Sequence, residues 1–277
     1  MRISIIGFVS VLVLGCNPKE TSKVSTDSSQ KTEITQQSTD SIIKEHLERG
    51  AWTKGLFSKE WQEEIDKGLA KDSTIAYLWQ QKAMPLYKQG KYELGLSYLD
   101  KAVIYDRNEW QEYRAFMKCI FAKNYRDAIK DFEDCKLKYG NRIVMDHNYD
   151  FYIAISKIQL NDYAEAETLL ADQIAELANQ KGEEWLHYLD LFYLGIAQYE
   201  QGKYEAAIIN FDRSLALYAN FSEALYYKGN SLGRLGNVTE AARLTEEARK
   251  YGLKGYTIND DNVRYERYPY QIIWKNW

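Results

Sequence analysis

The chain has 277 residues, of which 45% are hydrophobic and 27% charged, with 16 glycines and only 3 prolines. This composition is typical of a folded globular body and excludes collagen, a disulfide-stapled miniprotein and a wholly disordered chain. The net charge of −4 gives no basic surface for neutralising phosphates, so nucleic acid is not an expected partner.

The first residues predict a secretory signal. Arg2 is followed by an apolar run that reaches Leu14 and stops at Gly15 and Cys16. This run is shorter than the roughly 20 apolar residues of a membrane-spanning helix. The end of the run, from Val13 to Cys16, resembles the bacterial lipobox. The resemblance implies that residues 1–15 are removed and that Cys16 carries a lipid anchor; the alternative is an ordinary signal peptide with an incidental cysteine.

The segment after the cysteine is polar. Between residues 17 and 41 the only large apolar side chains are Val24 and Ile34, too few to drive folding. We therefore expect residues 16–41 to form a lipidated, disordered tether. By resemblance to lipoprotein sorting in two-membrane bacteria, Asn17 favours the outer membrane, so the expected location is the bacterial cell envelope. The sequence does not indicate which face of the membrane the protein occupies.

Residues 42–255 carry an internal repeat. Two windows align at a spacing of 34 residues without a gap. The repeated positions are small or apolar: Leu191, Gly195, Gly202 and Ala207 recur as Leu225, Gly229, Gly236 and Ala241. These residues resemble the tetratricopeptide repeat, a helix-turn-helix unit of 34 residues. Glycine or alanine at the helix crossing lets two helices pack closely, and Gly202 can adopt the positive φ that ends a helix.

Further copies lie upstream at wider spacing. Their marker aromatic residues are Tyr92, Tyr125, Tyr163 and Tyr204, whose spacing grows from 33 to 41 residues. The sequence therefore predicts insertions near residues 141–150 and lengthened helices near residues 177–184. Asn161 stands where the repeat usually has glycine, and asparagine tolerates that conformation better than most residues.

Ser58 and Pro85 also indicate where helices begin or bend. Ser58 is a predicted N-cap for a helix through Trp61, Ile65 and Leu69, the second half of a degenerate first repeat. Pro85 falls inside a predicted helix and predicts a kink or a shortened first turn.

These patterns predict an all-α fold, a right-handed superhelix (α-solenoid) of about four to six stacked TPR-like hairpins. Repeats bury their faces only against neighbours, so terminal units need caps. Residues 256–277 break the pattern and are rich in aromatic side chains. We expect this tail to fold back over the last repeat; the alternative is a docking segment that a partner orders.

No catalytic constellation stands out, so we expect no enzyme activity, no metal and no cofactor. Glu184, His187 and Asp190 share a spacing of three, which can hold a metal but is more typical of a solvated helix face. Cys119 and Cys135 would lie on the two helices of one hairpin, as free buried thiols or as a disulfide.

The family resemblance implies a groove lined by the first helix of each repeat. Its candidate partner-binding residues are Tyr77, Gln80, Met84, Tyr87, Lys88, Tyr113, Met117, Phe192, Tyr199, Tyr226, Asn230 and Arg234. Aromatic residues, Met and Arg are enriched at interfaces. The carboxylate-clamp variety wants Lys four residues before Asn230, where this chain has Tyr226. Some groove positions can instead be inter-repeat core, or lie under the tail.

The leading hypothesis from the sequence is a lipid-anchored scaffold that binds a peptide or protein partner in the cell envelope. The alternative is an envelope receptor for a small ligand or an oligosaccharide, using aromatic side chains to stack on sugar rings. The oligomeric state and the identity of the partner stay open.

Overall fold

The computed structural model describes residues 36–275. The predicted signal at residues 1–15, the predicted lipidation site Cys16 and Asn17 lie outside the described residues. The prediction that residues 36–41 belong to a disordered tether is wrong, because residues 36–43 are helical. In this helix Gln36 Nε2 donates to Asp40 Oδ1 at 2.9 Å, a side-chain pair one turn apart that favours helix.

The N-terminal half of the structure contains three helical hairpins. In the first hairpin, the helix of residues 36–43 continues as the π-helical turn η1 and packs against α2. A short 3₁₀ turn, η2, lies between η1 and α2. The elements of these three hairpins are η1 (Lys44–Glu48), η2 (Ala51–Thr53), α2 (Lys59–Lys71), α3 (Ala76–Lys88), α4 (Tyr92–Tyr105), α5 (Arg107–Phe116), its π-helical extension η3 (Met117–Phe121) and α6 (Tyr125–Tyr139).

The C-terminal half contains three more hairpins, followed by the tail. Their elements are β1 (Ile143–Val144), β2 (His147–Asn148), α7 (Tyr149–Gln159), α8 (Tyr163–Lys181), η4 (Glu183–Trp185), α9 (Tyr188–Glu200), α10 (Tyr204–Leu217), α11 (Ser222–Arg234), α12 (Val238–Gly252) and, within the tail, η5 (Asp261–Arg264). The antiparallel pair β1–β2 lies in the insertion predicted near residues 141–150. The 19-residue α8 is lengthened in the region predicted near residues 177–184.

Local chemistry explains where several helices begin. Ser58 Oγ accepts the Trp61 N–H at 3.2 Å, which confirms the predicted N-cap of α2. Asn148 Oδ1 accepts the Phe151 N–H at 3.0 Å at the start of α7. Within α3, the helix continues past Pro85 to Lys88, so the proline does not end it.

The turn inside each of the last five hairpins uses one residue with positive φ. Three of these are glycines, and the other two are Lys123 at +55° and Asn161 at +66°. The expectation for Asn161 is therefore confirmed. Lys123 shows that the left-handed conformation is set by the repeat and not by the residue alone, because lysine disfavours it.

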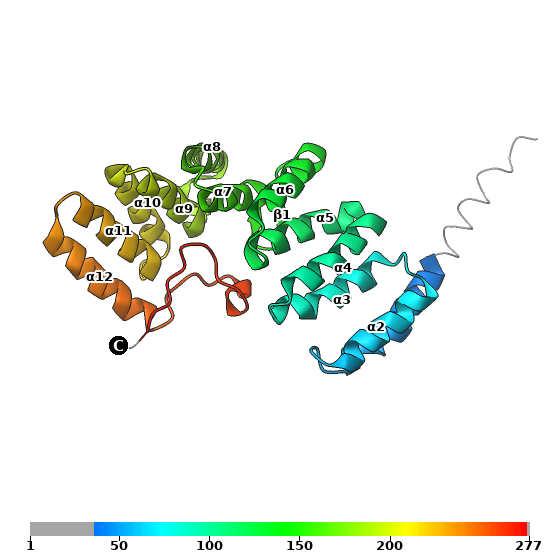
Figure 1. Ribbon diagram of the computed structural model, residues 1–277. Coiled ribbons are helices and arrows are strands. Elements are labelled where there is room, and N and C mark those ends of the chain that lie inside the picture. Colours follow the sequence, from blue (N-terminus) through cyan, green and yellow to red (C-terminus); the bar gives the residue numbers. More distant parts are fainter. Residues whose placement is uncertain (1–35, 276–277) are drawn as a thin grey trace, which may run out of the picture.

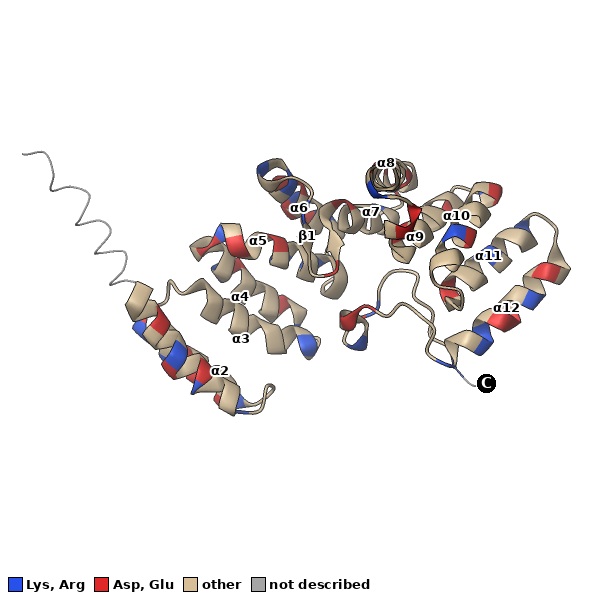
Figure 2. Cartoon of the chain, turned by 180° about the vertical axis from the view of Figure 1, so that it is seen from behind, with Lys and Arg blue, Asp and Glu red and all other residues tan. Residues whose placement is uncertain are grey.

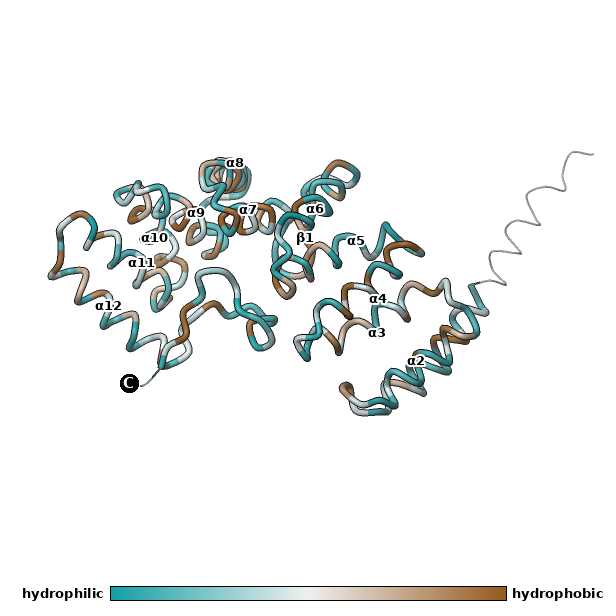
Figure 3. The backbone as a smooth tube through the Cα atoms, in the orientation of Figure 1, coloured by the Kyte–Doolittle hydropathy of each residue, from teal (hydrophilic) through white to brown (hydrophobic). Residues whose placement is uncertain are grey.

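Close packing within a hairpin depends on small residues, as the sequence predicts. A Cβ added at Gly195 in α9 would lie 2.6 Å from the Phe211 ring of α10. At Gly95 in α4 it would lie 2.8 Å from the Tyr87 ring of α3. Figure 3 shows that hydrophobic stretches recur along the whole array and are not gathered in one central core, as expected when each repeat buries its apolar faces against its neighbours.

The hairpins stack side by side along an arc, and the predicted all-α solenoid is confirmed (Figure 1). The tail lies on the inner side of this arc, between α11–α12 and α3–α4. Both acidic and basic residues occur along α2 and α12 (Figure 2). Within residues 36–275, no helix has the length and apolar character needed to cross a membrane.

Candidate functional site

The inner face of the arc is occupied by the C-terminal tail, residues 256–275. The tail leaves α12, runs along the first helices of successive hairpins, turns at η5 and returns to α11 (Figure 1). Its outgoing limb comprises residues 257–260 and its return limb residues 266–275. The far ends of the two limbs meet beside α11, and η5 lies at the tip of the tail.

Both limbs are held by one buried carboxylate, that of Glu223 in α11. Its Oε1 accepts hydrogen bonds from Thr257 Oγ1 on the outgoing limb and from the Ile272 N–H on the return limb, at 3.2 Å. Its Oε2 accepts from Ser222 Oγ at 2.9 Å. Glu223 is fully buried, and this burial raises its pKa in spite of the hydrogen bonds. Glu223 therefore closes the base of the tail loop.

The outgoing limb is fixed by polar contacts with the β1–β2 insertion and the fifth hairpin. Tyr188 OH donates to Asn259 Oδ1 at 2.7 Å. His147 Nε2 and Asp260 Oδ2 lie 3.0 Å apart, and both side chains are buried. Burial alone would raise the pKa of Asp260, but the hydrogen bond and the charge of His147 hold it below its ordinary value. The imidazole also stacks on Phe151, with ring centroids 3.7 Å apart.

The tip of the tail reaches the second and third hairpins. Tyr92 OH donates to Glu266, and Lys123 Nζ lies 3.6 Å from the Glu266 carboxylate. Lys123 Nζ also donates to the main-chain carbonyls of Ile120, at 2.6 Å, and of Arg267. Burial lowers the pKa of Lys123. Lys88 Nζ lies 4.6 Å from the centre of the Tyr265 ring, within the range of a cation–π contact.

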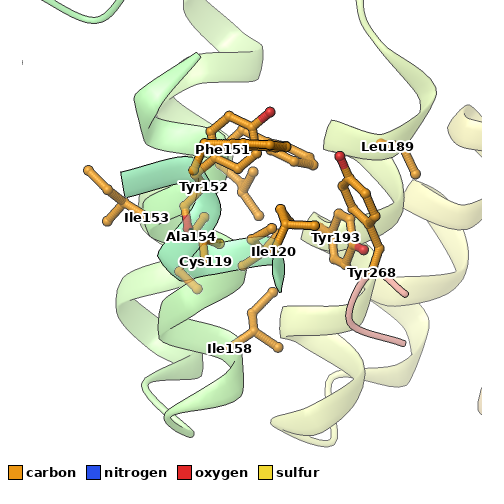
Figure 4. Close-up of a cluster of buried hydrophobic side chains, with 14 of the residues drawn as sticks. Cys119, Ile120, Phe151, Tyr152, Ile153, Ala154, Ile158, Leu189, Tyr193 and Tyr268 are labelled. Atoms are coloured by element: carbon orange, nitrogen blue, oxygen red, sulfur yellow. Dashed lines mark hydrogen bonds between the residues drawn. The ribbon is translucent and has the colours of Figure 1, made fainter. Parts of the chain in front are cut away.

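The return limb inserts one aromatic side chain into the repeat core. Tyr268, which is 2% exposed, lies beside Tyr193 and Ile120 (Figure 4). The Tyr193 hydroxyl donates to the Pro269 carbonyl at 2.8 Å. A turn follows, closed by the Gln271 N–H on the Tyr268 carbonyl at 3.2 Å, with Tyr270 at a φ of +61°.

The end of the return limb packs on the last hairpin. Trp274 Nε1 donates to Ser222 Oγ at 3.0 Å, and the Trp274 ring meets the Tyr226 ring edge-on at 6.0 Å. A Cβ added at Gly252 would lie 2.2 Å from the Trp274 ring. The end of the tail thus packs on the last hairpin, and the rest of the tail passes far beyond it.

The predicted groove residues fall into three groups. Tyr87, Met117 and Phe192 are buried in the core, because their side chains pack against neighbouring helices. Lys88 and Tyr226 contact the tail. The remaining positions lie elsewhere on the first helices of the repeats, and of these Gln80 is buried, Arg234 is exposed and the others are half-buried: Tyr77, Gln80, Met84, Tyr113, Tyr199, Asn230 and Arg234.

The residues that hold the tail most directly were not among the candidates. Glu223 stands in the first turn of α11, where an acidic residue is ordinary at a helix N-terminus. His147 belongs to the β1–β2 insertion, outside the repeat pattern, and Tyr193 and Lys123 resemble core and turn residues. None of these four residues departs from its local pattern enough to be identified from the sequence.

The N-terminal part of the array carries an aromatic cluster that the tail does not reach. Tyr77 and Trp110 are stacked, with ring centroids 5.9 Å apart and planes 10° apart. Trp110 meets Tyr113 edge-on at 6.0 Å. Beside the stacked pair is an open hollow of about 310 Å³ that also contacts Ile43 and Glu109.

The three residues with a spacing of three do not share one helix. Glu184 lies in η4, His187 is the N-cap of α9 and Asp190 is buried within α9. Residues 36–275 contain no cluster of three or more His, Cys, Asp or Glu side chains suited to a metal ion. Cys119 and Cys135 are free, buried thiols, which resolves the alternatives left by the sequence. Burial raises their pKa to about 12 and about 11.

Comparison with known proteins agrees with this architecture. A family model described as "Tetratricopeptide repeat" matches residues 191–220. A tetratricopeptide repeat protein from Parabacteroides merdae ATCC 43184 is 16% identical, with a TM-score of 0.60 over 79% of this chain and 88% of that chain. No curated protein matches the chain.

Two further solved structures share the fold. PilW, a widely conserved type IV pilus biogenesis factor, is 14% identical, with a TM-score of 0.58 over 82% of this chain and 99% of that chain. MamA from Desulfovibrio magneticus RS-1, from residue 41 to its end, is 15% identical, with a TM-score of 0.54 over 65% of this chain and 96% of that chain. The protein therefore has the fold of a tetratricopeptide-repeat solenoid.

Proposed function

We infer that the protein is a scaffold that binds a peptide or protein partner on the inner face of its arc, anchored by lipid at Cys16 in the bacterial cell envelope. One observation carries the binding role: the inner face already holds an irregular polypeptide segment. It does so through main-chain contacts of Lys123, Tyr193 and Glu223. A surface that positions a main chain in this way is suited to binding polypeptide.

PilW is a widely conserved type IV pilus biogenesis factor. That role belongs to PilW, and a biogenesis factor on this fold is in keeping with a binding function. Fold alone does not define function, so the proposal depends on the contacts of the inner face.

Crosslinking in intact cells tests the partner. A photoreactive amino acid at Tyr77 or Asn230, on the first helices of their hairpins, should give an adduct with one defined protein. Matched positions on second helices are Leu137, 87% exposed, and Ile209, 61% exposed; these should give none. Equal adducts at both sets of positions, or no adduct at any, would count against an inner-face scaffold.

Fractionation tests the anchor. Cys16→Ser should release the protein from membranes, because serine lacks the thiol that would receive the lipid. Durable anchoring needs two or three acyl chains, and the variant would have none. Asn17→Asp is the matched control, since it should leave the protein membrane-bound and change only the membrane to which it is sorted. Membrane retention of the Cys16→Ser variant would refute lipidation at this residue.

A further inference from the structure

We propose that the inner face under the tail is a binding site for a peptide segment of a partner, and that the tail is its resident, displaceable occupant. This inference depends on the proposed scaffold function and specifies the partner's chemistry. We call the site the tail-binding face and define it by Lys123, His147, Tyr188, Tyr193, Ser222 and Glu223.

The tail-binding face recognises main chain at three places along the return limb. Lys123 Nζ donates to the Arg267 carbonyl, Tyr193 OH donates to the Pro269 carbonyl at 2.8 Å and Glu223 accepts the Ile272 N–H at 3.2 Å. Such contacts do not depend on side-chain identity. Another segment that follows the same path can therefore use all of them.

Side-chain contacts define which segments fit. Glu266 pairs with Lys123 and Tyr92. Two residues later Tyr268 is inserted beside Tyr193, and Pro269 follows it, also buried. A matching partner segment thus has an acidic residue, an aromatic residue two positions later and then a proline that begins a turn.

The tail does not fit its site perfectly. Tyr270 has a φ of +61°, a conformation that costs a non-glycine residue roughly 1–2 kcal/mol. Among the described residues of the tail, Asn262 Nδ2 is buried without a hydrogen-bond partner. An open hollow of about 460 Å³ remains between the return limb and Lys123, Tyr125 and Gln159.

These features weaken the hold on the tail. Segments with unsatisfied polar groups and backbone strain belong to the less stable parts of a structure. The tail has regular structure only in the four residues of η5. Its advantage is covalent attachment, which gives it a high effective concentration at the site. A partner without the strain can overcome that advantage.

Hydrogen exchange on the unmodified full-length protein gives the first test. If the tail is displaceable, the amides of residues 266–274 exchange at least ten-fold faster than the interior amides of α9 and α11, which stay protected. Exchange of the tail only together with α9 and α11 would show that tail and repeats open as one cooperative unit, and would overturn the proposal.

Peptide binding to the full chain gives the second test. The probe is a fluorescent synthetic peptide with the sequence of residues 257–275. In the recipient, Tyr268→Ala plus Trp274→Ala weakens the resident tail and leaves the tail-binding face unchanged. We expect at least ten-fold tighter peptide binding to this variant than to the unmodified chain, and none for a scrambled peptide.

Two further results bear on the same test. Adding Tyr193→Phe to the recipient removes the donor to the Pro269 carbonyl and should weaken peptide binding about three- to ten-fold. Equal peptide binding by the unmodified and tail-weakened chains would overturn the proposal. So would loss of helical structure in the tail-weakened chain, because a displaceable occupant is not required for folding.

The outcomes separate the two proposals. If the peptide does not bind but crosslinking at Tyr77 or Asn230 still gives a defined adduct, the scaffold function stands and the displaceable tail does not. If the peptide binds but no inner-face position gives an adduct in cells, the scaffold function fails.

Discussion

His147 and Asp260 form a buried pair, with Nε2 and Oδ2 3.0 Å apart and side chains 4% and 7% exposed. The two residues lie far apart in the sequence. The pair joins the insertion between the third and fourth hairpins to the outgoing limb of the tail. A buried carboxylate in such a pair couples the position of the tail to protonation.

Asp260→Asn tests this coupling. Because the folded-state pKa of Asp260 lies below its ordinary value, its carboxylate stabilises the fold at neutral pH, and the contribution is lost as the pH falls through the folded-state value. We expect the variant to be less stable by about 1–3 kcal/mol at pH 7, with a smaller difference in acid. Chemical denaturation at both pH values measures this. Asp261→Asn, at an exposed neighbour, is the control, and a pH-independent difference would contradict the mechanism.

Asp190→Asn should have the opposite sign. Burial raises the pKa of Asp190 to about 6, so its ionisation favours the unfolded chain as the pH rises from about 4 to 6. At one pKa unit per 1.36 kcal/mol, the asparagine variant should be more stable at pH 7.5 by on the order of 2–3 kcal/mol. The two proteins should converge near pH 4. Urea denaturation checks this, with the exposed Asp172→Asn as control, and lower stability of the Asp190→Asn variant at pH 7.5 would refute it.

Gly252→Ala should displace the end of the tail. The added Cβ would lie 2.2 Å from the Trp274 ring, so the indole must move away from Gly252. Overpacking of this kind costs about 1–3 kcal/mol. The matched control is Gly233→Ala, whose added Cβ meets only an ordinary contact at 3.5 Å and should be neutral or stabilising. Melting temperatures of the two variants decide the point, and equal values would argue against the packing of Trp274 on α12.

Asn161 allows the turn conformation to be tested. At a φ of +66°, alanine should cost about 1 kcal/mol relative to asparagine, whereas glycine should stay within about 0.5 kcal/mol. Thermal unfolding of Asn161→Ala and Asn161→Gly measures the difference. Equal stability of the two variants would mean that the left-handed conformation is not enforced in solution.

The repeat was predictable because its spacing is a packing requirement. Gly195 and Ala207 must be small where helices cross, and Gly202 and Asn161 must tolerate positive φ, so these positions can be identified without structure. The groove residues were less predictable. Tyr87 and Phe192 belong to first helices that carry apolar or aromatic residues on more than one face. Periodicity alone therefore does not distinguish the face toward the core from the face toward the inner side.

The path of the tail could not be predicted. Residues 256–275 have no periodic pattern, and their position depends on specific pairings between distant residues, such as Tyr92 with Glu266. Aromatic content indicated only that the segment must be covered. Glu223 was hidden by its place in a helix first turn, where the same residue type is common without a structural partner.

Contacts between Tyr92 and Glu266, 174 residues apart, also have a mechanical consequence. A repeat array in which each unit touches only its neighbours unfolds piecemeal and bends readily. A tail that ties the sixth hairpin to the second adds sequence-distant contacts, which make unfolding more cooperative and folding slower. Release of the tail would therefore return elastic compliance to the whole superhelix, so that binding at one end changes the stiffness of the other.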